Sequence, residues 1–179
     1  MANYRETWKA LAAETGGEYL EHGRWPKMPL IRWNDGEREI VVEIIQSNGK
    51  LDTRGKAVLL NGTPFDFEAW FRSVFTMLGG LFGRNGIPAG NHDFDRRIII
   101  CGNDPVRIKN LFSHAGIRDN LLRRKKMHRF YLKQIEGLEK KSGGPVWMLI
   151  YWELGIQKEK EHVLEIYELI RETMQVIDR

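Results

Sequence analysis

Cysteines, secretion signals and long apolar runs are scarce or missing in this sequence, and each absence excludes a class of protein. The single cysteine, Cys101, excludes a framework of intramolecular disulfides, and its place in the apolar run 98–101 predicts a buried packing residue. No apolar run reaches the roughly 18 to 20 residues that a membrane-spanning helix needs. Residues 1–19 are amphipathic and lack the charged and apolar regions of a secretory signal. We therefore expect a soluble, cytoplasmic protein.

The signatures of common catalytic and nucleotide-binding sites are also missing. There is no G-x-S-x-G nucleophile elbow, and Cys101 and the five histidines form no recognisable catalytic arrangement. The glycines between residues 79 and 90 suggest a phosphate-binding loop, but neither G-x-x-x-x-G-K-[ST] nor G-x-G-x-x-G is placed between a strand and a helix. The sequence therefore favours a non-catalytic protein and predicts no cofactor.

What the sequence does contain is enough apolar side chain for one substantial core. Of its 179 residues, 42% are hydrophobic, so we expect residues 1–179 to form a single domain. The formal net charge of +4 is mild, and attraction to polyanions would be weak unless basic residues are concentrated in one segment.

Capping residues and apolar periodicity predict the helices. A first helix begins near the pair Asn3 and Glu6, which resembles a capping box, and ends at 16–17, where two glycines follow each other. Asp104 as N-cap, followed by a proline at the first helical position, predicts a second helix. This helix should run through Ala115 and stop at Gly116, with a short helical turn at 119–122 after it.

The end of the chain shows the clearest helical pattern. Its apolar residues follow the three-four spacing of one helical face, opposite a row of glutamates: Val163, Ile166, Tyr167, Ile170, Met174 and Ile177.

Short β-branched and aromatic runs predict the strands. From residue 18 to about residue 72 they are separated by Asn, Asp and Gly at 34–36, 48–49 and 61–62, which indicates an antiparallel meander. In the last run, alternate residues should share one strand face: Phe65, Phe67, Ala69 and Phe71. Further strands are expected at 96–101, 127–135 and 146–154.

The order of these elements predicts an α+β fold. We expect an antiparallel sheet of about seven or eight strands with an N-terminal helix, a middle helix and a long C-terminal amphipathic helix. Strands and helices do not alternate and the turns are too short for crossovers, so a doubly wound parallel fold is disfavoured.

Two segments resemble an uncharacterised family of small bacterial proteins. One is WKALAAETGGEYLEHGRWPKMPLIRW, which matches the pattern W-x-x-L-A-x-x-x-G-G-x-Y. The other is HDFDRRIIICGNDPVRIKNLF with the following IRDNLLR, which matches F-D-x-x-F/I-x-[IV]-x-G-[ND]-D. The resemblance covers most of residues 8–122, implies the fold alone and assigns no activity or site residue.

Residues 90–93, GNHD, resemble one signature block of the calcineurin-like metallophosphoesterases, whose Asn and His help to hold two metal ions. The chain has no Asp-x-His block upstream and no Gly-Asp-x-x-Asp block. A turn leading into a strand is therefore the favoured interpretation.

His92, Asp93 and Asp95 are nevertheless candidate ligands for a hard metal ion. The alternative for Asp95 is local: it pairs with the arginines that follow it or accepts backbone N–H groups in the turn. Phe94 is then an anchor in the core.

Basic residues are concentrated between residues 118 and 133, next to the aromatic Phe130 and Tyr131. Such a strip suits a nucleic acid, through phosphate contacts and base stacking, or an anionic membrane surface. The opposing interpretation is a solvated connection neutralised by the C-terminal segment, which holds seven acidic and four basic residues from Glu153 onward. The candidate polyanion-binding residues are Arg123, Arg124, Lys125, Lys126 and Arg129.

Residues 73–90 interleave apolar side chains with glycines, and two interpretations stay open. The apolar side chains either pack against the sheet or form an exposed patch for a partner or a membrane surface.

Together these observations predict a binding or structural module that acts through protein–protein contacts, as a homo-oligomer or with another protein. The six tryptophans suit such an interface. The alternative is polyanion binding through 118–133. The hypothesis of an enzyme, such as a metal-dependent phosphoesterase, depends on the GNHD motif alone.

Overall fold

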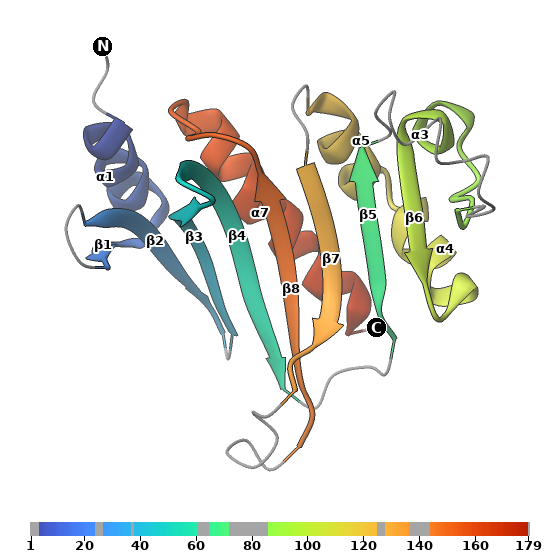
Figure 1. Cartoon of the computed structure of the whole chain (residues 1–179). Coiled ribbons are helices and arrows are strands. Elements are labelled where there is room, and N and C mark those ends of the chain that lie inside the picture. Colours follow the sequence, from blue (N-terminus) through green and yellow to red (C-terminus); the bar gives the residue numbers. More distant parts are fainter. Residues whose placement is uncertain are drawn as a thin grey trace.

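The computed structural model describes residues 4–23, 27–36, 38–60, 65–71, 86–124, 128–136 and 144–178. Within these residues eight strands form one sheet and five helices pack against it, which confirms the α+β prediction (Figure 1). The strands are β1 (Glu18–His22), β2 (Met28–Asp35), β3 (Arg38–Ser47), β4 (Lys50–Leu60), β5 (Phe67–Phe71), β6 (Ile98–Gly102), β7 (His128–Gln134) and β8 (Val146–Glu153). The helices are α1 (Tyr4–Thr15), α3 (His92–Arg97), α4 (Pro105–Ser113), α5 (Ala115–Arg123) and α7 (Lys160–Ile177).

All strand pairs are antiparallel, in the order β1-β2-β3-β4-β8-β7-β5-β6. The first four strands form the predicted meander. In the β3–β4 turn Asn48 and Gly49 both have positive φ, as a tight two-residue hairpin turn requires. The meander does not continue into β5, however, because β4 pairs with β8, while β5 pairs with β6 and β7. The turn expected at 61–62 lies outside the described residues.

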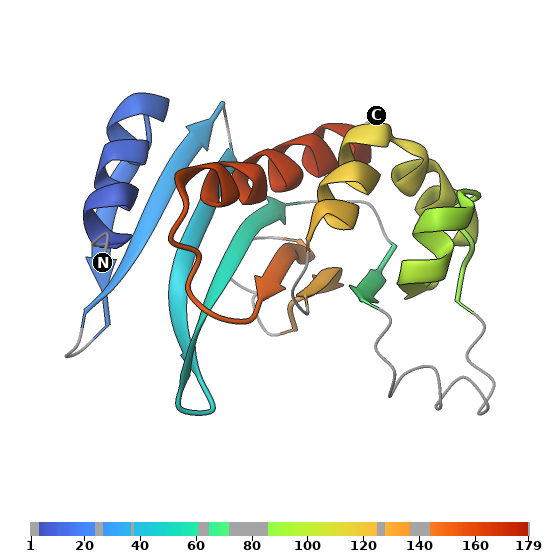
Figure 2. The ribbon, with the colours of Figure 1, turned by 90° about the horizontal axis from the view of Figure 1, so that it is seen from above.

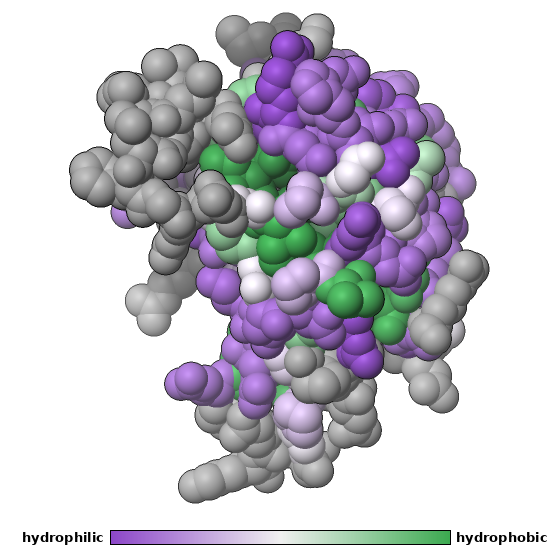
Figure 3. Space-filling view, turned by 90° about the vertical axis from the view of Figure 1, so that its right-hand side faces the viewer, coloured by the Kyte–Doolittle hydropathy of each residue, from purple (hydrophilic) through white to green (hydrophobic). Residues whose placement is uncertain are grey.

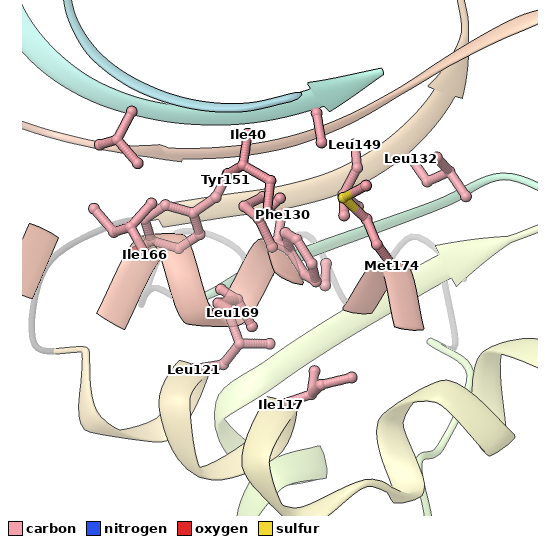
Figure 4. Close-up of a cluster of buried hydrophobic side chains, with 14 of the residues drawn as sticks. Ile40, Ile117, Leu121, Phe130, Leu132, Leu149, Tyr151, Ile166, Leu169 and Met174 are labelled. Atoms are coloured by element: carbon pink, nitrogen blue, oxygen red, sulfur yellow. The ribbon is translucent and has the colours of Figure 1, made fainter. Parts of the chain in front are cut away.

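The described helices lie on one side of the sheet (Figure 2). Helix α7 crosses β3, β4 and β8, and α1 covers β1 and β2. Gly55 of β4 permits the close approach of α7, because a Cβ atom there would lie 2.5 Å from Ile166 Cγ2. The main core fills the space between α5, α7 and the middle strands (Figure 4), and the buried alternating residues of β5, from Phe67 to Ala69, extend it as predicted.

Two helix boundaries differ from the predictions. Residues 92–97 form α3 instead of the start of a strand, because Asn91 caps the helix by accepting a hydrogen bond from the Phe94 N–H at 3.0 Å. The strand therefore begins at Ile98. Asp104 caps α4 as predicted, but Gly116 does not end a helical region, since α5 begins at Ala115 directly after α4.

No described helix combines the length and the apolar content needed to cross a membrane. Cys101 is half-buried in β6 and lies on the side of the sheet away from the helices, contrary to the expected core position.

Candidate functional site

The described residues of the predicted basic segment do not share one surface. Arg123 is exposed at the end of α5, on the helical side, with its Nε 3.7 Å from Glu165 Oε1. Arg129 lies on the opposite side of the sheet, in β7, where it forms an ion pair with Glu68. Lys125 and Lys126 lie outside the described residues.

Arg124 is fully buried and therefore cannot bind a polyanion in this arrangement. The end of α5 lies over β8, and the Arg124 guanidinium lies 5.4 Å from the centre of the Tyr151 ring. Its Nη2 donates to Asn120 Oδ1 at 2.8 Å, and its Nη1 lies 3.3 Å from Glu165 Oε2. This buried charge is thus paired within the protein, as burial requires.

The side chains in and after the GNHD segment mainly stabilise the local turn and the start of α3. Asp95 accepts hydrogen bonds from the backbone N–H groups of Ala89 and Gly90, at 2.8 and 3.2 Å, and Phe94 is buried in the core. His92 and Asp93 are exposed at the start of α3, with 3.6 Å between His92 Nδ1 and Asp93 Oδ1. Among the described residues no group of three or more His, Cys, Asp or Glu is arranged to hold a metal ion.

The side of the sheet opposite the described helices, which carries no helix of the described residues and which we call the helix-free face, is the first candidate site. Residues directly paired across neighbouring strands point to the same side, so the register identifies its members. One row runs across β3, β4, β8, β7 and β5: Glu43, Arg54, Trp152, Arg129 and Trp70. The next row runs across the same strands: Val41, Lys56, Ile150, Tyr131 and Glu68.

Both carboxylates in these two rows of the helix-free face, Glu43 and Glu68, form ion pairs with cations of the same face. Glu43 is only 3% exposed and accepts hydrogen bonds from Arg54 Nε at 2.9 Å and Nη2 at 2.6 Å, while Lys56 Nζ lies 2.7 Å away. Burial opposes ionisation of Glu43, but these cations outweigh it and lower the pKa of the carboxyl. Glu68 has a lowered pKa for the same reasons, with Arg129 and Lys133 as its partners.

Partly exposed apolar side chains lie beside these charged groups on the same face. Val58 of β4 is 41% exposed, and its neighbour across the β4–β8 pair, Met148, is partly exposed. Trp70 and Trp152 are also partly exposed. At the β6 end of the molecule, apolar side chains reach the surface with hydrophilic ones around them (Figure 3).

A buried polar cluster on the helical side was not predicted. Its members are three buried residues that are paired across neighbouring strands: Thr53 of β4, Glu153 of β8 and His128 of β7. Tyr151 donates a hydrogen bond to Glu153 Oε2 at 3.0 Å, and burial, together with the Glu153 charge, raises the Tyr151 pKa well above its usual value. The one signal in the sequence is a glutamate at the end of the apolar run 146–152.

Comparison with models of known protein families, with curated proteins and with solved structures finds no match to this chain. The resemblance to an uncharacterised bacterial family stays a prediction.

Proposed function

We propose that the protein is a binding module whose helix-free face pairs with the same face of a second copy. Such a contact gives a two-layer arrangement of sheets, each covered by its own helices on the outside. The proposal rests mainly on one observation: the face combines partly exposed apolar side chains with carboxylates that are already paired with cations of the same face.

This charge arrangement favours a second copy over a partner of opposite charge. In a two-fold dimer the same surface patch meets itself, so a patch with excess charge of one sign would repel its copy. Here Arg54 and Lys56 are paired with Glu43, while Arg129 and Lys133 are paired with Glu68. On the same face Arg32 forms ion pairs with Glu18 and Glu39, so these five cations meet four carboxylates and the excess is one charge. The apolar side chains around Val58 can then be buried while these charged groups keep their partners.

The same pairing argues against polyanion binding. A phosphate backbone attracts a surface with free cations that share one side of the protein. The described basic residues of 118–133 instead lie on both sides of the sheet or are buried, and Arg129 and Lys133 would have to release Glu68.

The test uses the two large apolar residues that are most exposed among the described ones. Val58→Arg puts a charge on the helix-free face, whereas the control Val106→Arg changes α4, where Val106 is 79% exposed. Sedimentation velocity on the unmodified protein should give a dimer of the 20.9 kDa chain. We expect V58R to weaken the dimer at least tenfold and V106R to leave it unchanged.

A monomer at concentrations up to about 100 μM would contradict the proposal, because a specific dimer interface of standard size gives tighter association. A dimer that V58R leaves intact would place the contact elsewhere. The unmodified protein is also titrated with a single-stranded oligonucleotide and with anionic vesicles at low salt. Binding that Arg129→Glu together with Lys133→Glu abolishes would favour the polyanion alternative.

A further inference from the structure

Cationic and aromatic side chains alternate along one row of the helix-free face. The row crosses β4, β8, β7 and β5, and its members are paired directly across neighbouring strands: Arg54, Trp152, Arg129 and Trp70. Both tryptophans are partly exposed. Single-stranded nucleic acid binds to surfaces of this composition, because cations contact its phosphates while aromatic rings stack on its bases.

Neighbouring positions add further side chains of the same two kinds. Tyr131 of β7 is partly exposed, and the Lys133 ammonium lies 5.5 Å from the centre of its ring. Lys56 of β4 lies in the same row as Tyr131. These cations and aromatic rings share the helix-free face, which by itself would suit a single strand of nucleic acid.

A carboxylate from β3, Glu43, is placed among these cations. Its Oε1 accepts a hydrogen bond from Arg54 Nη2 at 2.6 Å and lies 2.7 Å from Lys56 Nζ, and the residue is only 3% exposed. Replacing a buried ion pair by apolar residues is often neutral or stabilising, so stability alone does not explain a carboxylate at this position. Its charge repels phosphates, and an apolar residue would not have this effect.

Glu68 of β5 has the same relation to two cations of β7. It forms an ion pair with Arg129, and its Oε2 accepts a hydrogen bond from Lys133 Nζ at 3.3 Å. The pKa values of Glu43 and Glu68 are both lowered, so both carboxylates are ionised at neutral pH. A phosphate that approaches either pair of cations must displace a carboxylate from them.

We propose that Glu43 and Glu68 determine the specificity of the helix-free face, because they keep its cations paired and so exclude single-stranded nucleic acid. The inference rests on the proposed function, in which the same face is kept for a second copy of the chain. Repulsion of a wrong partner by like charge is a common source of specificity in protein interfaces.

The experiment compares the unmodified protein with Glu68→Gln and with the double variant Glu43→Gln/Glu68→Gln. Each glutamine keeps the shape of the side chain and removes its negative charge. Binding of a fluorescently labelled oligothymidylate is followed by anisotropy at low salt. The protein is used at concentrations where sedimentation velocity shows a monomer, so that the face is open. We expect E68Q to bind at least tenfold more tightly than the unmodified protein, and the double variant to bind more tightly again.

The salt dependence of binding identifies the contacts. The logarithm of the association constant for a single strand falls with the logarithm of the salt concentration, with a slope of about −0.7 for each phosphate contact. Two released cations in E68Q should give a slope of about −1.5, and four in the double variant should give about −3.

The matched control, Glu161→Gln with Glu168→Gln, makes the same change of net charge as the double variant. Both residues are exposed on α7, on the other side of the sheet. This control should bind the oligonucleotide no more tightly than the unmodified protein.

If the double variant does not fold, E68Q decides, because Glu68 is partly exposed. Equal affinities of E68Q and the unmodified protein, or an equal gain in the α7 control, would overturn the proposal. If the unmodified protein is a monomer at every concentration, the dimer is contradicted and this inference is not, because oligonucleotide binding is measured on the monomer.

Discussion

At the scale of single residues, Glu43 makes a testable contribution to stability. Its carboxylate is buried and holds Arg54 and Lys56, whose hydrogen bonds lower its pKa in spite of the burial. We expect Glu43→Gln to lower the free energy of unfolding at pH 7 by about 2 kcal/mol, the usual value for charged hydrogen bonds. Urea unfolding of both proteins measures the difference.

The pH dependence of that difference follows from the lowered pKa. A carboxyl with a lowered pKa in the native state stabilises the fold above its unfolded pKa of about 4.3, and this stabilisation is lost as the pH falls through the native value. The difference in the free energy of unfolding between the wild type and E43Q should therefore be largest near pH 7 and decrease below about pH 4.3. Glu39→Gln is the matched control, because Glu39 Oε2 lies 3.0 Å from Arg32 Nε in an ion pair but its side chain is largely exposed. This account would be contradicted by a difference in unfolding free energy that does not change with pH, or by a loss of stability in E39Q equal to that in E43Q.

Residue patterns predicted the apolar positions well, and they predicted the polar ones poorly. Phe94 and Phe67 are buried as expected, since alternation and flanking residues report burial directly. Arg124 stands in a run of four basic residues, Arg123 to Lys126, and no local pattern distinguishes it from its exposed neighbour Arg123. Its burial depends on Tyr151 and Glu165, which are distant in sequence and become neighbours only in the folded protein.

At the scale of elements, the packing of α7 on β4 depends on Gly55. A Cβ atom at this position would lie 2.5 Å from Ile166 Cγ2 and 3.5 Å from Ile170 Cγ1. We expect Gly55→Ala to destabilise the protein by about 2 kcal/mol, because α7 or its isoleucines must shift. Thermal and urea unfolding provide the measurement.

A double-mutant cycle distinguishes this contact from a general loss of stability. Ile166→Ala alone leaves a cavity and should cost about 2–5 kcal/mol. In the double variant the methyl group introduced by Gly55→Ala occupies part of that space. The loss of stability in the double variant should therefore be smaller than the sum of the two single losses, by about 1 kcal/mol or more. Additive losses would show that Gly55 and Ile166 do not interact.

The helices that the sequence predicted correctly are those with strong local signals. Asp104 followed by a proline identified α4, and the apolar stripe from Val163 to Ile177 identified α7. The short α3 was not predicted. The apolar run after it led to a strand prediction that began at Arg96, and its cap, Asn91, is also common in turns. Gly116 was misread as a stop because glycine is common after helices, whereas here it lies in the first turn of the next helix.

At the scale of the whole molecule, the order of the strands was beyond the reach of local patterns. Turn residues predicted that β2 and β3 are neighbours and that β3 and β4 are neighbours, because tight turns join adjacent strands. The position of β8 between β4 and β7 depends on pairing between residues that are far apart in the sequence, such as Ala57 with Leu149. No turn encodes such a pairing, so it follows only from the complete core.

The central position of β8 predicts that the chain unfolds as one unit. β8 pairs with the meander on one side and with β7 on the other, and α7 packs across β3, β4 and β8. Leu149→Ala, at a fully buried site in β8, should lower the free energy of unfolding by about 3 kcal/mol. Because both halves of the sheet share this strand, native-state hydrogen exchange should show the same loss of protection for Val42 in β3 and Phe130 in β7. If protection falls at Phe130 and stays unchanged at Val42, the two halves of the sheet unfold separately and the chain is not one cooperative domain.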